Sequence, residues 1–221
     1  MQSLRALILG APGSGKGTIS ARIVRKFDMK HISSGDILRN NILNKTPLGV
    51  AAKKFVDIGQ LVPDDIMIDV ISNELNKNSN ENWLLDGFPR TRLQAEELYK
   101  RAPVDVVINL VVPFEIIIER IKHRWIHLPS GRVYNLQFNA PKTPGIDDKT
   151  GEKLVQRKDD RPEAVQRRLE IYSKTVDPIL ELYKKKDILE EFHGKTSDEI
   201  WPQVYKFLSS HISPVTQKHK I

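Results

Sequence analysis

The chain has 221 residues, with 35 Lys or Arg against 28 Asp or Glu, so its formal net charge is +7. Without cysteine it can form neither disulfides nor Cys-ligated zinc or iron–sulfur sites, and no run of 18 apolar residues predicts a transmembrane helix. A basic chain typically binds nucleic acid or a polyphosphate. Because aromatic residues make up only 7% and no RNA-binding aromatic motif occurs, we favour the polyphosphate. Three residues precede the first predicted strand, so we expect no cleavable targeting peptide.

The first predicted strand, residues 4–9, leads into a glycine-rich loop and then a helix with Ile19, Ile23 and Phe27 on one face. Glycines allow backbone N–H groups to close around phosphate oxygens, and the helix N-terminus adds positive partial charge. Lys16 would supply a full charge, and we expect it to face solvent in the empty loop. The generic motif has Ser or Thr directly after this lysine, whereas here Gly17 intervenes. The loop residues expected to bind a triphosphate are Ala11, Gly13, Ser14, Gly15, Lys16, Gly17 and Thr18.

A second strand is predicted at residues 29–32, followed by a helix up to Leu43 and another from Pro47 to near Gly59. Residues 33 to 62 therefore form a small helical insert. The next helix has apolar residues from Ile66 to Leu75 at helical spacing, and residues 76–82 form a polar loop.

A buried strand end at residues 83–85 is followed at once by Asp86, Gly87, Pro89 and Arg90. In open parallel sheets, ligands bind at the carboxyl ends of the strands. Asp86 is thus placed to hold Mg²⁺ through water, as the second acidic element after a phosphate-binding loop does. A simple turn would explain Gly87 and Pro89, but not Asp86 and Arg90 together.

The remaining pattern predicts a helix at residues 91–101, a strand at 104–112, and a helix from Pro113 that brings Arg120 and Arg124 together at i and i+4. Residues 125 to 160 are rich in turns, with short strands around residues 130–131. We expect them to form a small insert that covers another part of the molecule. A long helix follows, which Pro178 should kink or split. The last strand is expected at residues 188–192, before a helix capped by Thr196 or Ser197.

The loop at residues 10–18 and the run from Trp83 to Gln94 resemble the two signatures of the adenylate kinase family. Residues 33–39 resemble the start of its nucleoside-monophosphate-binding insert, and residues 125–160 resemble its long lid. The resemblance covers nearly the whole chain. It implies an α/β fold of the P-loop nucleoside monophosphate kinase class, with a central parallel sheet flanked by helices, a helical insert and a small β-rich lid. The implied units are a core of residues 1–32, 63–124 and 161–221, an insert of 33–62 and a lid of 125–160.

Within the family, residues 125–127, 131–135 and 145–148 look most like the mitochondrial branch that uses GTP. This resemblance implies reversible Mg²⁺-dependent phosphoryl transfer from GTP to AMP, giving GDP and ADP, for nucleotide homeostasis. An ATP-using adenylate kinase is the alternative, because the guanine preference rests on resemblance alone. A monomer in the mitochondrial matrix is also implied, with nucleotide substrates and neither nucleic-acid nor membrane partners.

The resemblance also assigns roles by position. The catalytic residues would be Lys16, Arg90, Arg124, Arg157 and Arg168. Outside the loop, the triphosphate would contact Arg120, Arg124, Tyr134, Asn135 and Ser197. AMP would be held by Ser34, Arg39, Gln60, Gly87, Arg90, Gln94, Arg157 and Arg168. Its phosphate is already ionised, so the reaction needs no general base and the site should consist of arginines, Mg²⁺ and geometry.

Some members of this family bind zinc in the lid through four cysteines or a mixture with Asp. The corresponding positions here are His127, Ser130, Asp147 and Thr150. Because Ser and Thr are poor zinc ligands, we expect hydrogen bonds in place of the metal and no zinc. We also expect the lid arginines, Arg132 and Arg157, to be drawn inward only by bound phosphates.

The sequence is less consistent with two other classes of protein, a GTP-binding switch and a nucleic-acid-binding module. A GTP-binding switch needs an Asn-Lys-x-Asp box, and the nearest sequences, at residues 44–47 and 76–79, lack the Asp. A nucleic-acid-binding module is disfavoured by the low aromatic content. We therefore expect an enzyme.

Overall fold

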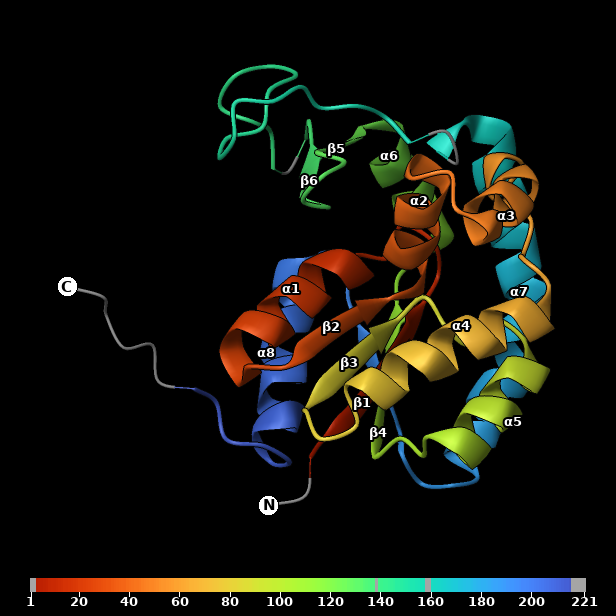
Figure 1. Cartoon of the computed structure of the whole chain (residues 1–221). Coiled ribbons are helices and arrows are strands. Elements are labelled where there is room, and N and C mark those ends of the chain that lie inside the picture. The colour runs from red at the N-terminus through yellow and green to blue at the C-terminus, as the bar shows by residue number, and fades with distance from the viewer. Residues whose placement is uncertain (1–2, 138, 158–159, 216–221) are drawn as a thin grey trace.

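The computed structural model describes residues 3–137, 139–157 and 160–215 and has an α/β fold (Figure 1). The central sheet consists of β1 (Arg5–Gly10), β2 (Lys30–Ser33), β3 (Trp83–Asp86), β4 (Val106–Val111) and β7 (Leu189–His193). A separate hairpin contains β5 (Arg124–Ile126) and β6 (Val133–Asn135). The helices are α1 (Lys16–Phe27), α2 (Ser34–Leu43), α3 (Pro47–Asp57), α4 (Asp64–Lys77), α5 (Arg92–Arg101), α6 (Phe114–Lys122), α7 (Pro162–Lys184) and α8 (Ser197–Ser209). In the described part of the chain, none of these helices is both long and apolar enough to cross a membrane.

Neighbouring strands of the central sheet all run parallel, in the order β2-β3-β1-β4-β7. Their carboxyl ends therefore meet at one edge of the sheet. The chain passes from β1 to β2 and β3 on one side and then to β4 on the other, and ligands bind at such a reversal. Ile8 of β1 pairs with Asp86 of β3, so the loop after Gly10 and the Asp86 carboxylate share this edge. The predicted fold class, a parallel sheet flanked by helices, is confirmed.

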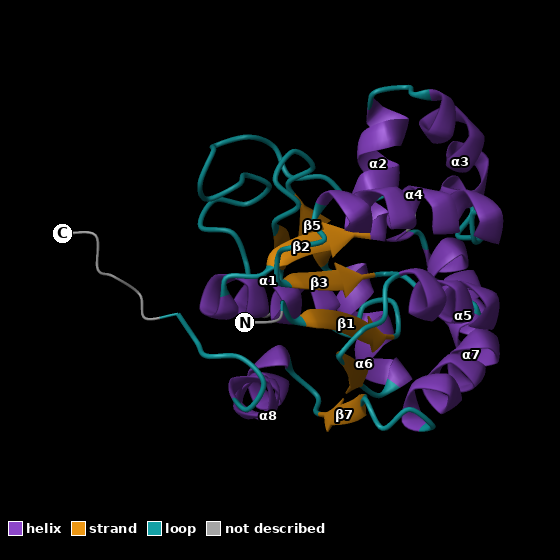
Figure 2. Cartoon of the chain, turned by 60° about the horizontal axis from the view of Figure 1, so that its bottom comes forward, coloured by secondary structure: helices purple, strands orange, loops and turns teal. Residues whose placement is uncertain are grey.

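The core has two parts because the side chains of β1 alternate between the faces of the sheet. Ala6 and Ile8 pack in a cluster that includes α1 and α8, whereas Leu7 and Leu9 pack in one that includes α4 and α5. Figure 2 separates α4 and α5, on the right, from α1 and α8, on the left. Each fully buried Leu or Ile contributes about 1.5–3 kcal/mol. The sheet is thus a firm base for the loops at its carboxyl edge.

Two segments stand over this edge. Helices α2 and α3 pack against each other and form the first, as the pattern of residues 33–62 predicts. The β5–β6 hairpin and the turns that follow it form the second, at the upper left of Figure 1. The candidate functional site, described below, lies between these two segments and the sheet.

One prediction about secondary structure is wrong. Helix α6 ends at Lys122, so Arg124 lies in β5 opposite Asn135 and not on one helix face with Arg120. The β5 strand follows the helix almost directly, and the helical spacing of the two arginines does not reveal it. Helix α7 continues through Pro178, so of the two outcomes expected there the split does not occur and the kink stays a prediction. A proline removes only one donor, and Ile179 and Tyr183 beyond it are buried in the core.

Candidate active site

The phosphate-binding loop joins β1 to α1. Gly15 precedes the helix with a left-handed φ of 97°, and its carbonyl accepts hydrogen bonds from the N–H groups of Thr18 and Ile19. A Cβ atom at Gly15 would come within 2.7 Å of the Ser197 Oγ atom, so only glycine fits. No described side chain caps this helix, so the N–H groups ahead of Thr18 face the edge of the sheet, where an anion could accept from them. The buried Ser14 hydroxyl has no hydrogen-bond partner among the described residues.

Lys16 does not face solvent, contrary to expectation. Its Nζ atom donates hydrogen bonds to the carbonyl oxygens of Gly10 (2.6 Å) and Ala11 (2.9 Å). Backbone oxygens of the loop thus hold the ammonium group.

The pKa of Lys16 is lowered to about 8. Burial is the main cause, and the positive charges of Arg90, Arg168 and Arg124 add to it, whereas Asp86 opposes the shift. These five side chains therefore share one electrostatic environment. The site thus concentrates four positive charges around one carboxylate, an arrangement that suits a polyanion.

One side of the phosphate-binding loop is bordered by α6 and the β7–α8 connection. Arg120 donates hydrogen bonds to the carbonyl oxygens of Ser14 (3.4 Å) and Lys195 (2.5 Å), so it joins the loop to that connection. Asn135 donates from Nδ2 to the Arg120 carbonyl at 2.9 Å. Arg120 and Ser197 thus lie beside the loop, and Asn135 is tied to the end of α6 through Arg120.

The Tyr134 hydroxyl is hydrogen-bonded to residues that follow the β5–β6 hairpin. Tyr134 is buried, its hydroxyl donates to Asp147 Oδ1 (2.9 Å), and it accepts from the Asp148 N–H (2.9 Å). Its hydrogen-bonding capacity is used within the lid segment, which a match by sequence position could not reveal.

A cavity between the helical insert and the segment after β3, here called the insert cavity, contains six of the eight residues expected to hold AMP. These are Arg39, Gln60, Gly87, Arg90, Gln94 and Arg168. Its apolar wall was not anticipated, because its residues follow the pattern of an ordinary core. This wall comprises Leu38, Val56, Leu61, Val62, Met67 and Phe88.

Ser34 lies beside the insert cavity rather than in its lining. A Cβ atom at Gly87, whose φ is +80°, would come 2.6 Å from the Ser34 Oγ atom. Gly87 therefore allows the buried Ser34 hydroxyl to approach the backbone, and that hydroxyl has no hydrogen-bond partner among the described residues. It is available to a ligand.

Arg39 and Arg157 both lower the pKa of Asp36. Burial alone would raise this pKa. The charge and hydrogen bond of Arg39, whose Nη2 lies 2.5 Å from Asp36 Oδ1, outweigh the effect of burial, and the charge of Arg157 lowers the pKa further. The pKa of Asp36 is therefore below its usual range. Arg157, which precedes α7, thus lies near the insert.

Asp160 connects two of the predicted catalytic arginines and was not predicted itself. Its side chain is only 3% exposed, forms a two-pronged ion pair with Arg124, and lies 3.7 Å from Arg168 Nη1. A carboxylate within a run of basic residues is the signal that could have identified it. Asp160 holds arginines from β5 and α7 on a common anchor.

A second cavity adjoins the phosphate-binding loop and is called the loop cavity. Its lining includes Lys16 and Pro12 together with apolar residues of α7 such as Ile171 and Val176. Gly59, Leu61, Gly87, Arg90 and Arg168 line both cavities. Arg90 and Arg168 therefore lie between the insert cavity and Lys16 of the loop cavity.

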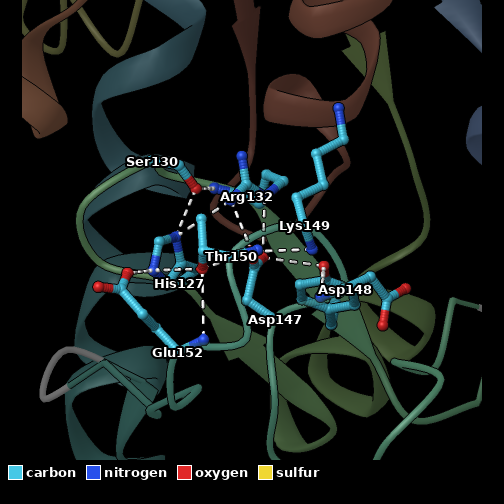
Figure 3. Close-up of polar contacts among 9 residues, drawn as sticks. His127, Ser130, Arg132, Asp147, Asp148, Lys149, Thr150 and Glu152 are labelled. Atoms are coloured by element: carbon cyan, nitrogen blue, oxygen red, sulfur yellow. Dashed lines mark hydrogen bonds and ion pairs between the residues drawn. The ribbon is translucent and has the colours of Figure 1, made fainter.

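The four lid positions expected to replace zinc ligands are linked by hydrogen bonds (Figure 3). His127 Nδ1 lies 2.7 Å from Ser130 Oγ, and Thr150 Oγ1 lies 3.4 Å from His127 Nε2 and donates to Asp147 Oδ2 at 2.9 Å. Glu152, which sequence reasoning missed, lies 2.5 Å from His127 Nε2. The expected hydrogen-bonded arrangement is observed.

Arg132 belongs to this network. We expected only bound phosphates to draw it inward, but it is already paired with Asp147. Its Nε and Nη2 atoms donate to the two carboxylate oxygens of Asp147, at 2.8 and 2.6 Å. This hydrogen bonding is the main cause that holds the pKa of the Asp147 carboxyl far below its usual range, and Thr150 and Tyr134 add to it. Arg132 thus stabilises the lid from within.

Comparison with known proteins agrees with this geometry. A family model described as adenylate kinase matches residues 8–188. The chain is 50% identical over 209 residues to the protein named "GTP:AMP phosphotransferase, mitochondrial" of Drosophila melanogaster, covering 95% of this chain and 97% of that one. It is 46% identical over 220 residues to a protein of the same name from Saccharomyces cerevisiae, covering 95% and 94%. It is 43% identical over 212 residues to "Adenylate kinase 4" of Oryza sativa subsp. japonica, covering 93% and 87%.

Proposed function

Because the chain belongs to the adenylate kinase family and is therefore a phosphotransferase, we propose that it transfers a phosphoryl group reversibly from GTP to AMP, giving GDP and ADP. One observation carries the proposal: Arg90 and Arg168 line both the insert cavity and the loop cavity that contains Lys16. An acceptor phosphate in the first cavity and a donor phosphate at the loop would thus meet between two shared arginines.

The chemistry follows from charge and position. The AMP phosphate oxygen is already a nucleophile, so no side chain has to remove a proton, and catalysis consists of alignment and charge stabilisation. Ser34, Arg39 and Arg90 would bind the acceptor phosphate and Gln94 its base. Lys16, Arg124, Arg157 and Arg168 would surround the phosphoryl group in flight. Arg120, Asn135 and Ser197 would hold the donor.

Mg²⁺ fits this site by the chemistry of its donor groups. It prefers oxygen ligands and is usually held by one or two carboxylates together with substrate phosphates and water. Asp86 supplies such a carboxylate beside Lys16, and in the described ranges no three His, Cys, Asp or Glu side chains gather into a metal site of their own. Asp86 would hold Mg²⁺ through water, and the bound ion would supply charge neutralisation at the phosphate oxygens.

The two segments over the sheet would move toward each other when substrates bind. Residues 33–62 and 125–160 would close as an acceptor-binding insert and a lid, and residues 1–32, 63–124 and 161–221 would form the core. Closure excludes water, which would otherwise hydrolyse the donor. The names of the fly and yeast relatives support a mitochondrial location, and the monomeric state and the matrix compartment are part of the proposal.

A coupled phosphotransfer assay with AMP as acceptor tests the donor. We expect kcat/KM to be highest with GTP, intermediate with ITP and lowest with ATP, because inosine keeps the O6 and N1–H groups of guanine and lacks only its amino group. ATP as the best donor would replace the GTP proposal by that of an ATP:AMP phosphotransferase. No transfer to AMP with any donor would overturn the proposed function.

Binding of the donor should be coupled to protonation of Lys16. With a pKa of about 8, Lys16 is mostly neutral at pH 9, and bound phosphates favour its charged form. We therefore expect uptake of most of a proton per GTP at pH 9 and much less at pH 7.5, where Lys16 is already mostly charged. Donor affinity should then weaken as the pH rises above about 8. Calorimetric titration in buffers of different ionisation enthalpy measures the uptake, which Lys16→Met should abolish.

A further inference from the structure

Gln94 lines the insert cavity from the start of α5, and its side chain is almost completely buried. Both ends of its amide are hydrogen-bonded within the protein. Oε1 accepts from the Arg90 backbone N–H at 2.7 Å, and Nε2 donates to Asp64 Oδ1 at 2.7 Å. Asp64 lies 30 residues earlier in the chain, in the first turn of α4.

These two partners leave the amide only one orientation. The Arg90 N–H group can only donate, and a carboxylate can only accept. A rotation of the Gln94 amide by 180° would place Nε2 against the N–H group and Oε1 against the carboxylate of Asp64. Such an arrangement loses both hydrogen bonds and leaves buried polar groups facing like groups.

Asp64 is itself fixed. Its Oδ2 atom accepts a hydrogen bond from Thr91 Oγ1 at 2.8 Å, and Thr91 Oγ1 accepts from the Gln94 N–H at 3.2 Å as the N-cap of α5. The negative charge of Asp64 also lies at the N-terminus of α4, where the helix dipole stabilises it. Asp64, Thr91 and Gln94 thus form a closed ring that ties α4 to the start of α5.

After these contacts the Gln94 amide keeps one hydrogen and one lone pair for a ligand. Adenine offers a donor at its 6-amino group and an acceptor at N1, whereas hypoxanthine offers an acceptor at O6 and a donor at N1. The two bases therefore need opposite amide orientations. We infer that Asp64 is a positioning residue that fixes the Gln94 amide and thereby makes the acceptor site select adenine over hypoxanthine. This inference rests on the proposed phosphorylation of AMP.

Acceptor selectivity tests the inference. Asp64→Asn keeps the size of the side chain, but its amide can pair with either end of Gln94. The ratio of kcat/KM for AMP to kcat/KM for IMP, with GTP as donor, should fall by about 10- to 100-fold, because a charge-assisted hydrogen bond no longer opposes rotation. The loss should be carried by the KM for AMP, with kcat little changed.

Asp65→Asn is the matched control, because it removes the same charge from the same turn of α4 at an exposed position. Its AMP-to-IMP ratio should equal that of the wild type. Asp64→Ala, which removes the acceptor altogether, serves the same comparison if Asp64→Asn does not fold.

The outcomes separate the inference from the proposed function. A wild type that phosphorylates AMP but shows the same AMP-to-IMP ratio as its Asp64 variants would overturn the inference alone. So would a wild type that uses IMP as well as AMP. A wild type inactive with AMP would overturn the proposed function first.

Discussion

Replacing Lys16 by Met is expected to lower kcat by about 10³-fold, because the variant loses the one full charge that the phosphate-binding loop directs at the donor phosphates. The fold should be retained. Burial and three neighbouring arginines disfavour the Lys16 ammonium, so a neutral side chain of similar size relieves an unfavourable charge. Steady-state kinetics and thermal unfolding of the purified variant measure the two effects.

Lys30→Met is the control for this experiment, because Lys30 is an exposed residue at the start of β2, away from the carboxyl edge of the sheet. It should keep the activity and the melting temperature of the wild type. Near-normal turnover in Lys16→Met would contradict the role given to the loop. A variant that loses activity only because it unfolds would instead show a lowered Tm.

Arg168→Ala is expected to lower kcat/KM by about 10³-fold, the lower range found for arginines that stabilise phosphoryl transfer. Arg168 lines both cavities, so its removal weakens the site for the acceptor phosphate and for the phosphoryl group in flight. Arg168→Lys should recover only part of the loss, because an ammonium keeps the charge but not the planar fork. Stability should change little, since Asp160 keeps its ion pair with Arg124.

Arg167→Ala provides the matched control for Arg168. The two arginines are adjacent on α7, but Arg167 is exposed and lines neither cavity. Its kinetic constants should equal those of the wild type. Equal losses in the two variants would mean that net charge near α7, rather than the position of Arg168, supports the reaction.

Local patterns were sufficient to predict the sheet and the phosphate-binding loop. The loop is one continuous segment with glycines at fixed spacing, and β1 and β4 are short apolar runs between turns. The glycine spacing and the apolar runs each extend over about ten residues, so they can be recognised in the sequence without knowledge of tertiary contacts. The position of Asp86 followed from the rule that strand ends share an edge.

Contacts between distant residues account for the errors. Arg132 was expected to wait for phosphate, but its partner Asp147 lies 15 residues later and is brought near only by the folded lid. The hydroxyl of Tyr134 donates to the same carboxylate, a contact that sequence position did not reveal, and the assignment of Tyr134 to the donor nucleotide stays a prediction. Lys16 was expected to face solvent, but its ammonium group binds two carbonyl oxygens of the loop. A sequence motif does not specify which carbonyl oxygens point toward the lysine. Pairings of this kind depend on tertiary structure and have no periodicity to detect.

The hydrogen-bonded lid also limits how this chain could evolve. His127 is shared by Ser130, Thr150 and Glu152, so a single change to cysteine would break part of this arrangement without completing a set of four zinc ligands. Each buried polar group left unpaired costs about 1–3 kcal/mol, against a total stability of about 5–15 kcal/mol. Intermediates between a hydrogen-bonded lid and a zinc-bound lid are therefore less stable than either. Descendants of this sequence should keep the arrangement intact or exchange it in several steps compensated elsewhere.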